Sequence, residues 1–426
     1  MTPPPVPPGS APQGPSATPS NVPTPGTAST PGHVDLTNFL RRHGPSLIDF
    51  RRDLHRHPEP SYEEHATTDK VCNWLRANGL DPQVLSRGTG LICDVGYGDG
   101  PIVALRADID ALAMDDLTDS EYTSRRPGVA HACGHDVHTS VVLGAGIALQ
   151  TLDEMGRLPG PVRLIFEPGE ETVPGGAVDV IKEGFLDGVG VVFGMHCDPK
   201  ADLGRLGGRV GPITSASDTV EIVLRGPGGH TARPERTVDL VRVSGQLVTE
   251  VPGRFAELCA PVGATRLVWG ALHTGEAPNV IPSVARMRGT MRTPSRELWD
   301  AAPGLLRRAL DDVLGQTGVQ WELIYNRGIP PVVNDADAMG IMEQAALASF
   351  GEGAVFATEQ SWGGDSFAWY LEEVPGAYAR LGTHNPASAG PRLDLHASTF
   401  DVDERAIGIG VSVMVNSALL WQAKHL

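Results

Sequence analysis

The segment HACGHDVH, residues 131–138, holds the densest group of side chains that could bind a metal ion. A thiolate beside a divalent cation has a strongly lowered pKa and can bridge two cations, and imidazole binds Zn, Ni, Co and Mn. One histidine alone is more often a helix-surface residue, but Cys133 and His135 within this cluster favour metal ligation. His131 and His135 are four residues apart, yet Ala132 stands where a zincin requires glutamate, which excludes that kind of zinc site.

A second group of candidate site residues follows the apolar run VRLIF, in the segment FEPGEETVPGG of residues 166–176. Glu170 and Glu171 are adjacent there, and two neighbouring carboxylates at the end of a buried strand are costly unless cations or protons compensate their charge. Their side chains must diverge, so one can bind a metal while the other faces the substrate as a general base. A solvated loop of acids is the alternative for this segment taken alone.

Two single histidines and two aspartates complete the candidate site. His196 ends the apolar run GVVFGMH and His396 lies in LDLHASTFDVDE, and each alone is more often a hydrogen-bonded core residue. With the first two groups they give Cys, His, Glu, His and His ligands, enough for two metal ions with open positions for water. Asp110 is expected to accept a hydrogen bond from a ligand imidazole and to fix its tautomer. Asp108 either does the same or caps the turn.

The elements that must position these side chains alternate between helices and strands. Apolar residues at helical spacing predict helices over residues 36–54, with a break near Gly44-Pro45, over residues 64–78 and over residues 134–149. Strands are predicted at LICDVG, PIVALRAD, PVRLIFE and GVVFGMH. Strands that are apolar almost throughout indicate an α/β fold, in which helices cover both faces of a largely parallel sheet. Sites in such folds lie at the C-terminal ends of the strands.

Residues 214–327 have a different pattern, with strands and helices in the order β-α-β-β-α-β. That order is typical of a compact ferredoxin-like α+β unit. The sequence therefore predicts a catalytic α/β domain in two pieces, residues 34–213 and 328–426, with this unit inserted between them. Residues 1–33 are mostly Pro, Ser, Thr and Gly and are expected to form a disordered tail, with a polyproline docking motif in PPPVPP as the alternative.

Composition and charge exclude several classes of protein. The formal net charge of the 426 residues is −17, and no run of Lys or Arg stands out, which argues against nucleic acid or an anionic membrane as partner. No segment is expected to span a bilayer, residues 140–149 being interpreted as a buried helix, and no secretory signal is recognised at the start of the sequence. The five irregularly spaced cysteines favour reduced thiols, so a cytoplasmic location is expected.

In this order the motifs resemble the aminoacylase/carboxypeptidase family of co-catalytic metallopeptidases, and most of all its amidohydrolase branch of hippurate hydrolases and plant auxin-conjugate hydrolases. The likeness runs from about Leu36 to the C-terminus, through HRHPEPSYEE, ALRADIDAL, HACGHDVH, EPGEE, GMH, GGHTARP, APNVIP and LHASTFDVDE. It implies two divalent ions, Zn, Mn, Ni or Co, bridged by Cys133 and held by four terminal ligands: His135, Glu171, His196 and His396. It also implies Glu170 as the general base and Asp110 as the orienting group.

The resemblance gives the inserted unit the roles of a lid and a dimerisation domain. His230 in GGHTARP and Asn279 in APNVIP are then expected to grip the scissile carbonyl or the product carboxylate, with His230 reaching the partner's site in a homodimer; a structural His230 is the alternative. The implied reaction is hydrolysis of the amide bond of small N-acyl amino acids or related conjugates. A dipeptidase or carboxypeptidase of the same family is the nearer alternative, and a catalytically silent relative that binds conjugates or metals is the more distant one.

The sequence departs from the family pattern at a few positions that are not proposed ligands. Glu167 and Gly169 stand where many relatives have Gln and Ala, Glu235 stands where a His is common, and Asp365-Ser366 replaces a frequent Glu-Asp. The acid at Glu167 is expected to add negative charge near the metals. These departures bear on substrate choice and leave the hydrolytic chemistry as it is.

Overall fold

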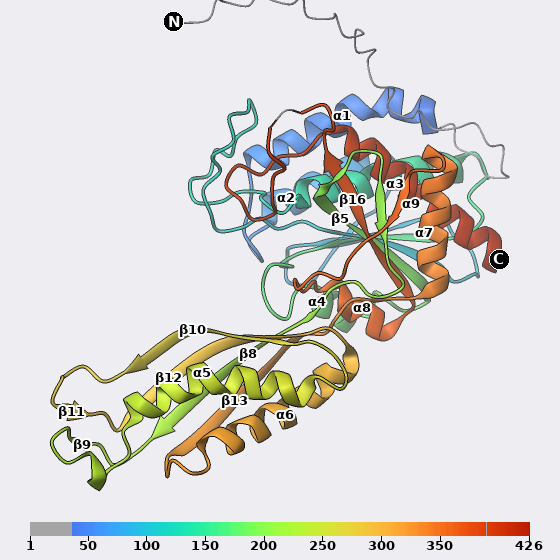
Figure 1. Cartoon of the computed structure of the whole chain (residues 1–426). Helices are drawn as coiled ribbons and strands as arrows, with labels where there is room; N and C mark the ends of the chain where they lie inside the picture. Colours follow the sequence, from blue (N-terminus) through green and yellow to red (C-terminus); the bar gives the residue numbers. More distant parts are fainter. Residues whose placement is uncertain (1–35, 389) are drawn as a thin grey trace, which may run out of the picture.

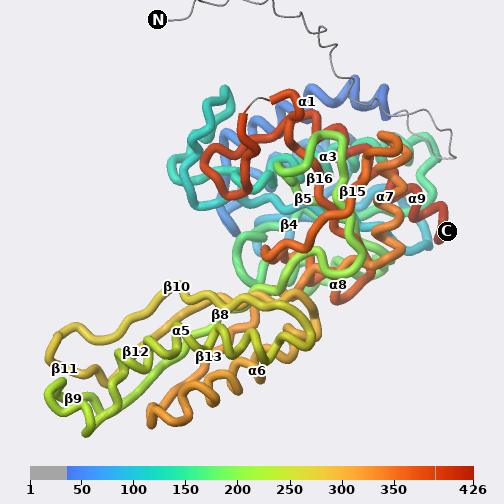
Figure 2. Tube along the Cα trace, in the orientation of Figure 1, coloured from blue at the N-terminus to red at the C-terminus, as the bar shows by residue number. Residues whose placement is uncertain are grey.

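The computed structural model describes residues 36–388 and 390–426. The tail predicted over residues 1–33, with its PPPVPP motif, lies outside the described residues. Figure 1 shows a rounded part, in which helices surround a central sheet, and an elongated part, in which two helices cover a second sheet. Figure 2 follows the trace through the elongated part as one continuous stretch of sequence, coloured from green to orange.

The sheet of the rounded part has eight strands in the order β1-β2-β4-β3-β5-β16-β6-β15. Its pairs β3–β4, β3–β5, β5–β16 and β6–β15 are parallel, whereas β1–β2, β2–β4 and β6–β16 are antiparallel. The strands are β1 (Gln83–Val84), β2 (Leu91–Val95), β3 (Ile102–Asp108), β4 (Val162–Glu167), β5 (Val189–Asp202), β6 (Leu206–Gly208), β15 (Val355–Ala357) and β16 (Gly376–His384). The predicted α/β fold with a mostly parallel sheet is confirmed.

Helices cover both faces of this sheet because its strands are apolar on both sides. Leu105 of β3 belongs to the larger core, which packs against α1, α3, α7 and α9, whereas its neighbour Ala104 belongs to a smaller core under α4 and α8. This alternation follows from the two-residue period of a strand. The helices are α1 (Leu36–Arg56), α2 (His65–Ala77), α3 (His135–Glu154), α4 (Ala177–Lys182), α7 (Ala336–Phe350), α8 (Phe367–Glu373) and α9 (Arg405–His425).

Two expectations about helices are corrected by the structure. The break expected near Gly44-Pro45 is absent, because α1 runs without interruption through Pro45. Pro45 is exposed, so solvent can satisfy the carbonyl that loses its helical hydrogen bond. The second is the expectation that no segment is long or apolar enough to cross a membrane. By length and composition alone α9 is, with a mean hydropathy of 1.5 in its most apolar window. The structure buries 72% of that window, as expected for a core helix that is apolar all round.

The second sheet has the antiparallel order β10-β12-β8-β13, formed by β8 (Ala216–Arg225), β10 (Arg266–Thr274), β12 (Val284–Thr293) and β13 (Gln320–Ile329). Helices α5 (Leu240–Cys259) and α6 (Arg296–Leu314) pack on it around a separate apolar core. The expected ferredoxin-like α+β unit is thus confirmed, while the domain boundaries at residues 214 and 327 stay a prediction. The remaining short elements are β7 (Gly211–Pro212), β9 (Gly229–His230), η1 (Pro234–Arg236), β11 (Val280–Ile281) and β14 (Val333–Asn334).

Candidate metal centre

A tight turn before α3 brings Cys133 and His135 to the same site. Gly134 is the residue before the helix and has a φ of 88°, a conformation that favours glycine. A Cβ at this position would lie 2.8 Å from Cys197 Sγ, so the close approach of β5 also requires glycine. The turn therefore explains why HACGH can place a thiol and an imidazole side by side.

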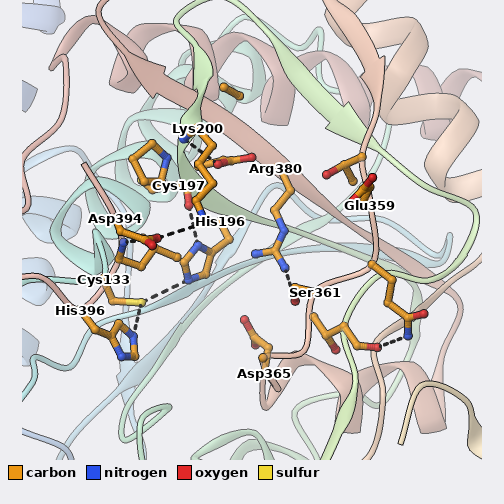
Figure 3. A pocket seen from close by; sticks show the side chains of 18 of the residues that line it. Cys133, His196, Cys197, Lys200, Glu359, Ser361, Asp365, Arg380, Asp394 and His396 are labelled. Carbon is orange, nitrogen blue, oxygen red and sulfur yellow. Dashed lines mark hydrogen bonds and ion pairs between the residues drawn. The ribbon is translucent and has the colours of Figure 1, made fainter. Parts of the chain in front are cut away.

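The five predicted ligands converge from the turn and first residue of α3, from strand β5 and from two loops. Cys133 Sγ lies 3.3 Å from His196 Nε2 and 3.3 Å from His396 Nε2, as the dashed lines in Figure 3 show. Glu171 Oε1 lies 3.5 Å from His396 Nε2 and 3.8 Å from His135 Nε2. The ligand atoms of Cys133, His135 and His196 all lie within 4.8 Å of one another, and so do those of Cys133, Glu171 and His396. The sulfur belongs to both groups, which is the position that a bridging ligand takes.

Two unpartnered buried atoms show that this donor set fits metal ions. His135 Nε2 and Glu171 Oε1 are buried and have no hydrogen-bond partner among the residues that the structure describes. Buried polar atoms without partners are costly, and a cation between them removes that cost. Burial, with Glu171 and Glu170 nearby, raises the pKa of the Cys133 thiol well above its usual value, so a thiolate here requires positive charge. Sulfur, imidazole and carboxylate donors together suit first-row transition metals.

Asp110 fixes the tautomer of His135. The Nδ1 atom of His135 lies 3.1 Å from Asp110 Oδ1 and 3.0 Å from the Asp110 carbonyl oxygen, so it carries the proton and leaves Nε2 to accept a metal. Asp110 Oδ2 accepts from Ser61 Oγ at 2.7 Å and from the Glu171 N–H at 2.9 Å. Burial opposes ionisation, but these hydrogen bonds, that from His135 first, hold the pKa of Asp110 below its ordinary value. A single carboxylate thus joins three motifs of the sequence.

Replacing Asp110 by Ala is expected to weaken metal binding about 10–100-fold, because the imidazole of His135 loses the acceptor that orients it. Competition with a chelator of known affinity measures this change. Ser61→Ala is the matched control, since it removes another partner of Asp110 and leaves the His135 contact in place. Equal metal affinity in wild type and Asp110→Ala would contradict the assigned role.

The third histidine of the cluster, His138, is not available to a metal. Its Nδ1 donates to Asp108 at 2.6 Å, and its Nε2 accepts the Cys197 N–H at 2.8 Å, so both nitrogens are used. Asp108 also accepts from Arg106 at 2.6 Å, so it orients His138 and balances a buried guanidinium. Burial lowers the pKa of His131 to about 3, which keeps that histidine neutral.

Glu170 lies beside the ligands and has the properties of a proton acceptor. Its carboxylate is buried and accepts the Ser366 N–H at 3.2 Å. Burial first, and then the carboxylates of Asp365 and Glu171, raise its pKa well above the ordinary value for glutamate. A carboxylate with a raised pKa binds a proton more strongly than an ordinary glutamate does. Asp365 is itself held by the Tyr378 hydroxyl, which donates to it at 2.5 Å.

The expectation that Glu167 adds negative charge near the metals is corrected by its partners. Arg106 Nε donates to Glu167 at 2.7 Å, and Ser366 Oγ and the Tyr370 hydroxyl donate at 2.5 and 3.0 Å. Arg106 itself is 1% exposed. The departure from Gln at this position therefore creates a buried ion pair beneath the site, and its charge is balanced locally.

Sequence reasoning missed Glu64, which anchors the EPGEE turn. Its Oε1 accepts the Gly169 N–H at 2.7 Å and the Tyr62 N–H at 2.8 Å. Burial and the nearby Asp110 raise the pKa of Glu64 to about 7. The signal for it was the motif HPEPSYEE, which contributed to the resemblance but received no role there.

The structure does not bring His230 and Asn279 to the ligands of the same chain. Both are exposed, and they belong to the β9–β11 region, where the Thr231 N–H donates to the Asn279 carbonyl at 3.3 Å. Figure 1 shows β9 and β11 at the end of the elongated part that lies farthest from β5 and β16. Neither residue lines the cavity beside the ligands. Their predicted contact with the substrate is therefore not formed at the ligands of their own chain.

A cavity of about 720 Å³ opens beside the ligand cluster, a size that suits a small molecule. Cys133, Glu170, Glu171, His196 and His396 form one side of it. Strand β15 and the segment that follows it line the cavity as well, and Figure 3 shows Arg380 of β16 between His196 and Ser361.

This fold and site define a metal-dependent amidohydrolase of the metallopeptidase type. The chain belongs to Peptidase family M20/M25/M40, which it matches over residues 104–419. A Bacillus subtilis N-acetylcysteine deacetylase is 35% identical over 379 residues, which cover 88% of this chain and 96% of that protein. The crystal structure of the Bacillus subtilis YXEP protein, a dinuclear metal binding peptidase from the M20 family, has a TM-score of 0.77 and 32% identity, covering 91% of this chain and all of that one.

A Rhodococcus jostii protein provisionally named glutamate–cysteine ligase 2-3 is 45% identical over 369 residues, or 87% of this chain. The chain spans only 46% of the length of that relative.

Proposed function

We propose that this protein hydrolyses the amide bond of small N-acyl amino acids, with two divalent metal ions held by Cys133, His135, Glu171, His196 and His396. The observation that supports this most is the shared position of the Cys133 sulfur in two groups of ligand atoms, with the carboxylate of Glu170 beside them. Zn, Mn, Ni and Co all accept such mixed donors, so the identity of the metal is left to experiment. The dinuclear site of the YXEP protein supports the number of ions.

When bound, the cations would act as Lewis acids that ease deprotonation of the attacking water and polarise the substrate carbonyl. Glu170 accepts the proton of that water in the proposed reaction and then gives it to the leaving amine. The Ser366 N–H holds the Glu170 carboxylate in position, and Asp110 keeps the His135 ring in the orientation that ligation requires. Because Glu170 is buried, the proton that it carries is shielded from bulk water.

The names of two relatives support an N-acyl-cysteine as the first substrate to test. One relative is an N-acetylcysteine deacetylase, and the name of the other refers to a ligase of glutamate and cysteine. A panel of N-acetyl and N-benzoyl amino acids that includes N-acetylcysteine, assayed beside dipeptides with each metal, tests the proposal. Faster turnover of dipeptides would favour the alternative of a dipeptidase or carboxypeptidase. No turnover of any amide by the metal-loaded protein would favour a silent binding protein.

We further propose a homodimer formed through the elongated unit, in which His230 and Asn279 complete the site of the partner subunit. Their position far from the ligands of their own chain supports this arrangement, and strand β10 offers an unpaired sheet edge for assembly.

A mixed dimer of one Glu170→Gln chain and one His230→Ala chain, purified with two different tags, tests this arrangement. Each parent homodimer is expected to be inactive. The mixed dimer should recover about half of the wild-type activity, because one of its two sites has both Glu170 and the partner's His230 intact. If His230 acted within its own chain, the mixed dimer would be inactive. An active His230→Ala homodimer would show that His230 is a structural residue.

A further inference from the structure

Arg380 is a cation that lines the cavity beside the predicted ligands. It lies on β16 directly opposite His196 of the parallel strand β5. Paired residues of neighbouring strands point to the same face of a sheet, so both side chains are directed to the same side. Tyr378, two residues earlier on β16, lies on that face as well, with its ring centroid 6.3 Å from that of His196. Figure 3 shows the guanidinium of Arg380 directed across the cavity toward Ser361.

The guanidinium of Arg380 has little to neutralise it. It donates one hydrogen bond, to Ser361 Oγ at 3.1 Å, and among the described residues it forms no ion pair with a carboxylate. The fully buried guanidinium of Arg106 differs in its partners, because it forms ion pairs with Glu167 and Asp108 at 2.7 and 2.6 Å. A guanidinium has five N–H donors in a planar fork that matches a carboxylate, and most of those of Arg380 are unused.

The second cation of the cavity wall is of a different kind. Lys200 has a side chain that is 69% exposed, and it lies 3.4 Å from the carboxylate of Asp394. An exposed lysine that already has a partner is a weak anion site. Arg380 is only partly exposed, and a Cβ on its cross-strand neighbour Gly207 would approach its own Cβ to 3.1 Å. The absence of a side chain at Gly207 therefore leaves room for Arg380.

We propose that Arg380 binds a free carboxylate of the substrate and so makes the enzyme selective for amides that carry a carboxylate over neutral amides. The proposal rests on the proposed function and names the residue that recognises the carboxylate of the substrate. A carboxylate can accept two parallel hydrogen bonds from the guanidinium, a geometry that an uncharged carboxamide matches poorly. Ser361 holds one end of the fork in place, and the remaining donors face the cavity beside the metal ligands. The guanidinium recognises a carboxylate on the amino-acid half and one on a dicarboxylic acyl group by the same hydrogen bonds, and the test below distinguishes the two.

The test compares an acid with its amide in the metal-loaded enzyme. Wild type, Arg380→Gln and Arg380→Lys are assayed with N-acetylmethionine, with N-acetylmethioninamide and with N-succinylmethioninamide, whose only carboxylate lies on the acyl side. Arg380→Gln is expected to lower kcat/KM about 10–100-fold for one of the two acids, mainly through KM, and to leave N-acetylmethioninamide unchanged. The acid that loses rate identifies which half of the substrate carries the carboxylate. Arg380→Lys should retain part of the preference for the acid over the amide. Lys200→Gln is the matched control, and it should change each rate less than about threefold, which is the size of effect that an exposed ion pair has.

A binding measurement separates this proposal from the proposed function. Calorimetric titration of N-acetylmethionine and N-succinylmethioninamide into metal-loaded Glu170→Gln requires no hydrolysis, and the Arg380→Gln/Glu170→Gln double variant is expected to bind one of them at least about tenfold more weakly. If wild type cleaves none of the amides, the proposed function fails, yet the titration still tests Arg380. Equal losses for the acids and for N-acetylmethioninamide would show a merely structural role, and unchanged affinity for both acids in the double variant would likewise overturn the proposal. Metal content equal to that of wild type confirms that each variant is folded.

Discussion

Replacing Glu170 by Gln is expected to lower kcat for amide hydrolysis by about 10²–10⁴-fold while leaving the fold and the metal content unchanged. The carboxamide has nearly the same shape and can still accept the Ser366 N–H that the carboxylate accepts at 3.2 Å. It cannot take a proton from water, so the loss should appear in kcat and only weakly in KM. Steady-state kinetics on the best N-acyl amino acid, together with metal analysis of the same sample, measures both quantities.

The neighbouring residue provides the control for this variant. Glu171→Gln removes a predicted ligand, so it should lower activity together with metal content, whereas Glu170→Gln should lower activity alone. Near-normal turnover by Glu170→Gln would rule out Glu170 as the base. A loss of metal in Glu170→Gln equal to that in Glu171→Gln would assign both carboxylates to ligation.

Replacing Cys133 by Ser is expected to reduce the bound metal below two ions per chain and to abolish most of the activity. A neutral hydroxyl bridges two cations poorly, whereas a thiolate carries a negative charge that both cations share. Plasma emission spectrometry after gel filtration gives the stoichiometry, and activity with added metal shows whether excess ions restore function.

Cys197→Ser is the matched control for Cys133→Ser, because Cys197 is another buried thiol of the same region but belongs to none of the groups of potential ligand atoms. It is expected to keep two ions per chain. If Cys133→Ser also keeps two ions, the proposed bridge is wrong.

Three predicted ligands, Cys133, His135 and Glu171, have a strong local signal in the sequence, whereas His196 and His396 become candidates only together with them. Cys133 and His135 lie in a dense cluster, and Glu170 and Glu171 form an acidic pair after a buried strand. The alternation of apolar strands and helices was also sufficient to predict the class of both sheets. These features depend on residues that are close together in the chain.

The remainder depends on contacts between distant residues, which local patterns do not report. The pairing of Arg106 with Glu167, 61 residues away, removes the charge that the sequence led us to expect near the metals. The position of Arg380 opposite His196 follows from the parallel pairing of β16 with β5, and nothing in the segment GAYARLGTH announces it. The continuity of α1 through Pro45 depends on the exposure of that residue, which only packing decides.

The elongated unit leaves and rejoins the rest of the protein at neighbouring points. Ser217 near the start of β8 pairs with Ile329 at the end of β13, although the intervening chain contains α5, α6 and the strands from β9 to β12. Both ends of the unit are therefore attached at one place. A change in its length or orientation would leave the spacing of the predicted ligands from Cys133 to His396 unchanged. A change in the reach of the unit would instead move His230 and Asn279, and so would act on the site of the partner subunit proposed above.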